Sequence, residues 1–146
     1  MPRPNIDLVG VAWLRSLAGV PSDSVATKLP SADKLRGGFV RWRSGLGGSP
    51  GTSIRRPIGA AECWAAPSAG SSQVPWGAAS DLVEAVFTAA DAPEFITVRL
   101  ALPGTYGSVL VHSVRALGEP AKVEGDPSGF ARFDVDLEIN WTGVPQ

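Results

Sequence analysis

The stretch FARFDVDLEINW, residues 130–141, decides the fold because apolar and polar side chains alternate strictly from Arg132 onward. One set of alternate positions is apolar: Phe133, Val135, Leu137, Ile139 and Trp141. The other set is polar: Arg132, Asp134, Asp136, Glu138 and Asn140. Since neighbouring residues on a strand point to opposite faces, the pattern predicts a strand with one face on a core and the other toward water.

The same period of two extends through most of the second half of the chain. FITVRLAL, residues 95–102, and SVLVHSVRAL, residues 108–117, alternate in this way and are separated by the turn sequence PGTYG. In the first half, FVRWR at 39–43 and IRRPIGAAECWAA at 54–66 also read as strands, and a short strand is expected at 24–29. Pro57 lacks an amide donor, which places its part of the strand at an edge or at the start.

Two segments have helical periodicity instead. Residues 5–18 place Ile6, Val9, Trp13 and Leu17 on one helix face, and Asn5 or Asp7 can cap its first turn. The second helix lies within residues 71–91, with Pro75 suited to its first turn and Ser71 or Ser72 as its cap. We therefore predict one α+β domain over residues 1–146, with a mainly antiparallel sheet of about five to six strands and two helices packed on one face.

Charge divides the sequence into two unlike halves although the net charge is only −1. Residues 1–66 contain nine Lys or Arg and four Asp or Glu, whereas residues 67–146 contain four and ten. Folding can mix the halves, or the subunit can present a basic and an acidic face suited to head-to-tail association. No membrane span or signal peptide is evident at the N-terminus, so we expect synthesis in the cytoplasm and no membrane partner.

Few residues could carry catalysis or hold a cofactor. One cysteine and one histidine cannot build a typical zinc site, and GLGGSPG lacks the Lys-Ser/Thr of a phosphate-binding loop. Cys63 and His112 could pair as nucleophile and base, but each lies in an alternating strand, where a buried cysteine and a sheet histidine are commoner. We expect no metal, no cofactor and no catalytic residues, and we interpret Asp134, Asp136 and Glu138 as a solvated acidic row.

Basic residues gather around a glycine-rich connection at residues 44–53. Arg41 and Arg43 share one strand face before it, and Arg55 and Arg56 follow it. Such a patch can contact phosphates, or it can pair with the acidic row (Asp134, Asp136, Glu138) of a neighbouring subunit, which we favour. The connection itself is long enough to contact a neighbour, through Gly45, Leu46, Gly47 and Gly48.

The order of these motifs resembles that of tail terminator proteins of long-tailed bacteriophages, particularly the actinobacteriophage type. The resemblance covers nearly the whole chain. Its motifs are an N-terminal helix before VATKLPSAD, then FVRWRSGLGG, then RRPIGAAECWAA leading into AASDLVEAVFTAAD, and finally GEPAKVEGDPSGFARFDVDLEINW. The segment FITVRLALPGTYGSVLV departs from the pattern, because a shorter link is expected after the second helix.

The resemblance implies a structural role in the virion and no enzymatic activity. Tail terminators form a hexameric ring that caps the completed tail tube, ends its polymerisation and provides the surface that joins the head. The implied partners are further copies of the chain, the tail tube protein, a head-completion or neck protein, and DNA passing through the lumen. Three alternatives stay open: another neck or connector ring protein, a small cysteine-dependent enzyme, and a nonspecific DNA binder.

Overall fold

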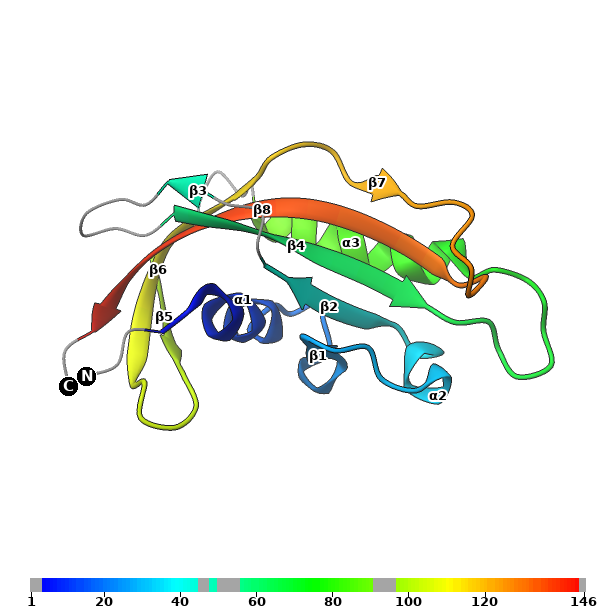
Figure 1. Ribbon diagram of the computed structural model, residues 1–146, viewed down its shortest axis with the longest axis horizontal. Helices are drawn as coiled ribbons and strands as arrows, with labels where there is room; N and C mark the ends of the chain where they lie inside the picture. Colours follow the sequence, from blue (N-terminus) through cyan, green and yellow to red (C-terminus); the bar gives the residue numbers. More distant parts are fainter. Residues whose placement is uncertain (1–3, 45–47, 50–55, 91–96, 145–146) are drawn as a thin grey trace.

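The computed structural model describes residues 4–44, 48–49, 56–90 and 97–144, which form one α+β domain (Figure 1). Its helical elements are α1 (Ile6–Arg15), the 3-10 turn η1 (Ser22–Ser24), α2 (Ala32–Leu35) and α3 (Trp76–Ala90). Its strands are β1 (Val25–Ala26), β2 (Phe39–Arg43), β3 (Gly48–Ser49), β4 (Arg56–Ala65), β5 (Val98–Ala101), β6 (Ser108–Ala116), β7 (Ala121–Lys122) and β8 (Ala131–Val144).

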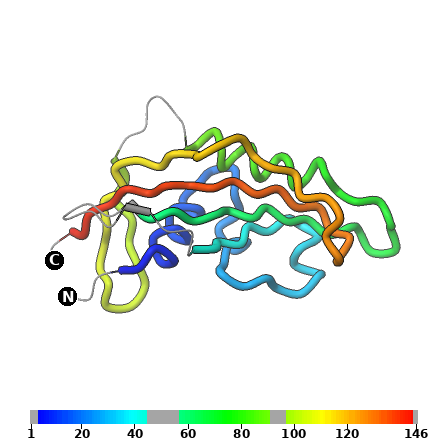
Figure 2. Tube along the Cα trace, turned by 45° about the horizontal axis from the view of Figure 1, so that its top comes forward, coloured from blue at the N-terminus to red at the C-terminus, as the bar shows by residue number. Residues whose placement is uncertain are grey.

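The strands form one curved sheet in the order β1-β2-β4-β8-β6-β5, with β3 added to β4 and β7 added to β8. All pairs are antiparallel except β1–β2, which is parallel. The long strand β8 runs along the middle of the sheet, with β4 on one side and β6 and β7 on the other (Figure 2). The sheet prediction is confirmed, and β8 is the strand that the alternating stretch 130–141 predicted.

Both long helices pack on the same face of the sheet, as predicted. Val9 and Trp13 of α1 and Val83 and Val86 of α3 belong to one buried cluster with the core-facing side chains of β2, β4, β6 and β8. In Figure 1, β4 and β8 arch over α1. On β8 the predicted core residues are buried, except that Phe133 is only partly covered. On the opposite face of the central strands only the short α2 packs, through Leu35, over one end of β2 and β4.

Close packing of α1 on the sheet depends on two glycines around one tryptophan. The Trp42 indole of β2 is fully buried between Gly10 of α1 and Gly59 of β4. A Cβ atom on either glycine would overlap the indole ring, so only glycine lets the helix, the ring and the strand approach this closely.

Several local predictions need correction. Asn5 does cap α1, because its Oδ1 accepts a hydrogen bond from Leu8 N–H at 3.1 Å, but α1 ends at Arg15 rather than near Ala18. The N–H groups of Ser16 and Leu17 bond to carbonyls three residues back, which tightens and closes the last turn.

The region between α1 and β2 was also predicted too simply. The strand expected at 24–29 is only two residues long, because the chain turns after Ala26, and α2 was not predicted. Ser71 does not cap α3: its hydroxyl accepts from Gln73 N–H, three residues before the helix begins. Short elements of this kind carry too few residues for periodicity to reveal them.

Candidate functional site: a charge cluster around Glu62

The face of the sheet opposite α1 and α3 is organised around one buried carboxylate, Glu62 of β4. In register across three strands lie Arg41 of β2, Glu62 and Asp134 of β8. Because strand neighbours alternate, Glu62 points away from the core while Cys63 points into it. Glu62 is only 2% exposed although both long helices lie on the other face. Its own neighbours on the sheet therefore shield it from water.

Three arginines and one indole surround the Glu62 carboxylate. Oε1 lies 3.5 Å from Arg41 Nη1 and accepts a hydrogen bond of 3.2 Å from Trp64 Nε1–H. Oε2 lies 3.0 Å from Arg43 Nε and 3.2 Å from Arg132 Nη2. Taking a carboxylate out of water costs several kcal/mol, and close positive charges and hydrogen bonds offset that cost.

Arg132 links Glu62 to the acidic residues of β8 and of the loop before it. Its Nε and Nη2 donate to the two oxygens of Asp134 at 2.9 and 2.8 Å, a bidentate pair. Asp126 lies 3.9 Å from Arg132 Nη1, and the guanidinium sits 5.1 Å from the centre of the Trp64 ring. The hydrogen bonds with Asp134, followed by the nearby negative charges, raise the pKa of Arg132.

Asp126 is held in its ionised form by a local turn. Its Oδ1 accepts hydrogen bonds from the hydroxyl of Ser128, at 2.5 Å, and from Ser128 N–H, at 2.9 Å. These bonds, rather than Arg132, are the main reason that the pKa of Asp126 lies below its ordinary value.

Arg41 and Arg43 are the parts of this cluster that solvent reaches. Their side chains are 36% and 41% exposed, compared with 21% for Arg132. Each has one nitrogen in an ion pair with Glu62, and Arg41 Nε also donates a hydrogen bond to the Thr27 carbonyl at 3.2 Å. The remaining N–H groups can bind an external anion, such as a phosphate or a carboxylate, from a fixed position.

The remaining predicted site residues lie in different places. Arg56 is at the start of β4, four residues before Ala60, which is the partner of Arg43. That spacing corresponds to about 13 Å along the strand, so its backbone is well away from the cluster. Gly48 pairs with Pro57 between β3 and β4, which confirms that Pro57 is near a strand start. Arg55, Gly45, Leu46 and Gly47 lie outside the described residues.

The acidic row separates into three environments. Asp134 is inside the charge cluster, paired with Arg132 of the same strand. Asp136 is exposed opposite Ala60, and Glu138 is half-buried with Ile58 and Arg115 on either side. Asp136 is the solvated carboxylate that the sequence predicted, and Glu138 is only partly solvated.

Cys63 and His112 do not form a nucleophile–base pair. Cys63 is fully buried on the core face of β4, where desolvation above all raises the pKa of its thiol. His112 belongs to β6, two strands away, and its Nε2 lies 2.8 Å from Thr142 Oγ1. Within the described part of the chain no group of three or more His, Cys, Asp or Glu residues is placed to hold a metal.

Sequence reasoning missed Glu62 and Arg132 as members of the site. The sequence did not single out Glu62 at all, and it placed Arg132 only as a polar position on β8. The signal was present in the alternation, since both fall on the outward face of their strands. What the sequence lacked was the β2–β4–β8 register, which brings Glu62 between Arg41 and Asp134.

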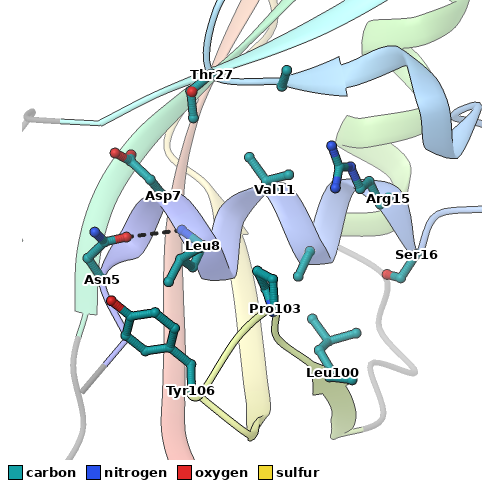
Figure 3. Close-up of a pocket in the computed structure, with 13 residues that line it drawn as sticks. Asn5, Asp7, Leu8, Val11, Arg15, Ser16, Thr27, Leu100, Pro103 and Tyr106 are labelled. Atoms are coloured by element: carbon teal, nitrogen blue, oxygen red, sulfur yellow. Dashed lines mark hydrogen bonds between the residues drawn. The ribbon is translucent and has the colours of Figure 1, made fainter. Parts of the chain in front are cut away.

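A second surface feature is a groove along the exposed side of α1, with a volume of about 700 Å³ (Figure 3). Its floor is formed by Leu8, Val11 and Ala12 of α1. One wall is the edge strand β1 with Thr27, and the other is β5 with Pro103 and Tyr106 of the following turn. Asp7 and Arg15 lie at its two ends.

No protein-family model matches this chain, and no curated protein sequence matches it. Among the residues described, no helix is long and apolar enough to cross a membrane. Functional assignment therefore depends on the motif order of the sequence and on the two surface features.

Proposed function

We propose that the chain is a ring-forming tail terminator, which caps the finished tail tube of a long-tailed bacteriophage and provides the surface that joins the head. The observation that supports this most is where the resembling motifs lie. FVRWR, RRPIGAAECWAA and the final alternating stretch correspond to β2, β4 and β8, three adjacent strands. The motifs thus make one structural unit, centred on the Glu62 cluster.

The surface features are compatible with such a role. Subunits of a closed ring meet through two different patches, so each copy needs two separate contact surfaces. The sheet face with Arg41 and Arg43 and the groove along α1 are such separate surfaces. In a ring, the half-exposed arginines would face either a neighbouring subunit or DNA in the lumen.

The length of the tail in a phage that lacks the gene tests the proposal. Without a terminator the tube continues to grow, so electron microscopy should show over-long tails of variable length. Complementation with the wild-type gene should restore a uniform length. Tails of normal length, or no tails at all, would contradict the terminator role, and the second outcome would favour another neck or connector ring protein.

A further inference from the structure

The groove along α1 has an ordered pattern of charge. Asp7, Val11 and Arg15 are spaced four residues apart, so they follow one side of the helix, as Figure 3 shows. The order along the groove is an acid, an apolar floor and a base. From Asp7 to Arg15 the helix rises about 12 Å. A ligand that fits should therefore carry a base, an apolar group and an acid over a similar distance.

The free groups of the groove are open to such a ligand. Asp7 forms no ion pair with any residue of the described ranges. Arg15 is exposed and donates from Nη2 to the Val25 carbonyl at 2.9 Å, which fixes the guanidinium and leaves its other N–H groups available. The walls are β1 and β5, the two edge strands of the sheet path.

The same chain carries the complementary pattern on another surface. Arg115, Leu117 and Glu119 follow one another at every second residue where β6 leads toward β7, and all three are exposed. Four residues of near-extended chain span up to about 13 Å, close to the roughly 12 Å between Asp7 and Arg15. The chain bends at 117–119, which shortens the distance from Arg115 to Glu119, but their long side chains can extend to cover the difference.

Leu117 is unusual among the described residues because it is a large apolar side chain with 42% exposure. The only other such residue in the described ranges is Leu29, at 37%, two residues beyond Thr27 of the groove wall. Leu29 thus lies beside the groove, and Leu117 belongs to the segment whose charge pattern complements the groove. Burying both would remove these apolar surfaces from water.

The segment cannot reach the groove of its own copy. Tyr106, just before β6, lines the groove, whereas Leu117 comes after the far end of β6. The eight steps from Ser108 to Ala116 extend about 26 Å. In Figure 1 the connection from β6 to β7 runs above the sheet while α1 lies below it. A contact between the two surfaces must therefore join two copies.

We propose that residues 115–119 of one copy dock into the α1 groove of the next. Arg115 pairs with Asp7, Leu117 packs on Leu8 and Val11, and Glu119 pairs with Arg15. The contact joins two different surfaces, so each copy offers one groove and one projecting segment, as a ring requires. This inference rests on the proposed ring function and identifies the surfaces by which the ring would close.

Disulfide trapping tests the contact directly. One preparation carries Val11→Cys and a second carries Leu117→Cys. The native Cys63 is left in place in both, because it is buried. After mixing and mild oxidation, a covalent heterodimer should form at least about tenfold faster than between Leu117→Cys and the control Thr88→Cys, since docking raises the local thiol concentration. Thr88 is exposed on α3, away from the groove. Equal rates for the two mixtures would overturn the proposal.

A charge exchange gives a second, independent readout. Asp7→Lys and Arg115→Glu should each weaken self-association by about tenfold. The chain with both changes should recover most of it, because the exchange restores a pair of opposite charges between position 7 of one copy and position 115 of its neighbour. Glu84→Lys, exposed on α3, is the control and should leave association unchanged. Sedimentation measures all four variants. A double variant that associates no better than the single variants would contradict the docking model.

These experiments separate the inference from the function on which it rests. If Leu117→Asp still forms the wild-type oligomer and no cross-link appears, the ring closes through other surfaces, and only the docking model fails. If tails lacking the protein have normal length, the terminator function fails, whatever the cross-linking shows.

Discussion

The charge cluster and the α1 groove are both polar surface regions, but they are built in opposite ways. Around Glu62 the charged groups form ion pairs with one another within the chain, at N–O distances of 3.0 to 3.5 Å for the three arginines. Along the groove Asp7 forms no ion pair within the described residues, and the apolar floor is uncovered. The difference indicates that the cluster mainly stabilises the subunit and leaves only the outer N–H groups of Arg41 and Arg43 for a partner, whereas the whole groove is available to one.

Removing Glu62 should have the largest effect on folding. Glu62→Ala leaves three arginines close together without their shared counter-charge, and it leaves the Trp64 indole without its acceptor. We expect a loss of about 2–3 kcal/mol in unfolding free energy, below the roughly 3–5 kcal/mol typical of a fully buried charge, because Arg41 and Arg43 reach solvent. Urea unfolding measures this change.

Asp136→Ala is the matched control for Glu62→Ala. Asp136 belongs to the same sheet face, is exposed, and is in no ion pair within the described ranges, so its replacement should cost less than about 0.5 kcal/mol. Equal losses for the two variants would show that the cluster does not stabilise the subunit.

The support beneath the groove can be disturbed without touching its charges. Gly10→Ala places a methyl group against the buried Trp42 ring and should cost about 1–3 kcal/mol, partly offset by the better helix propensity of alanine. Gly77→Ala, in the first turn of α3 with nothing within 4 Å of the added carbon, should be neutral or slightly stabilising. Thermal unfolding compares the two, and similar melting temperatures would exclude close packing at Trp42.

Removing the N-cap of α1, at one end of the groove, should have a smaller effect on stability. Asn5→Ala removes the acceptor of Leu8 N–H and should cost about 1 kcal/mol. Asn5→Asp keeps an acceptor at this position and should recover most of the loss. Chemical denaturation gives the unfolding free energy of wild type and of the two variants. An Asn5→Ala variant as stable as wild type would show that the cap contributes nothing.

The smallest effect is a pH dependence at the edge of the cluster. The pKa of Asp126 is lower in the folded state than in the unfolded chain. The stability that Asp126 contributes is therefore fully present when the pH is above its unfolded-state pKa, and it is lost as the pH falls through its folded-state pKa. Wild type should therefore lose more stability between about pH 5 and pH 2 than Asp126→Asn does. Parallel acid-unfolding curves for both proteins would contradict this.

Much of the fold could be predicted from the sequence because long periodic segments carry their own signal. The alternation in residues 130–141 identified β8 and its core face, and the stripe in residues 71–91 identified α3. The two-residue β1 and the four-residue α2 could not be predicted from a repeating pattern. The position of β1 depends on pairing with β2, and that of α2 on packing of Leu35 against β2 and β4.

The candidate site was predicted only in part, for a related reason. Arg41 and Arg43 were placed on one strand face correctly, because that depends on period two alone. Glu62 and Arg132 joined them only through the pairing of β2, β4 and β8, which no single segment encodes. The groove along α1 combines residues from α1, β1, β5 and the β5–β6 turn, so it is a property of the curved sheet as a whole.

Light scattering over a wide concentration range gives the mass of the purified protein in solution and so tests whether it assembles into a ring. If it does, the wild-type protein forms one closed species of uniform mass, corresponding to six copies, and Leu117→Asp converts it to monomers. A wild-type protein that stays monomeric at the highest concentration, and that is also missing from purified tails, would contradict it.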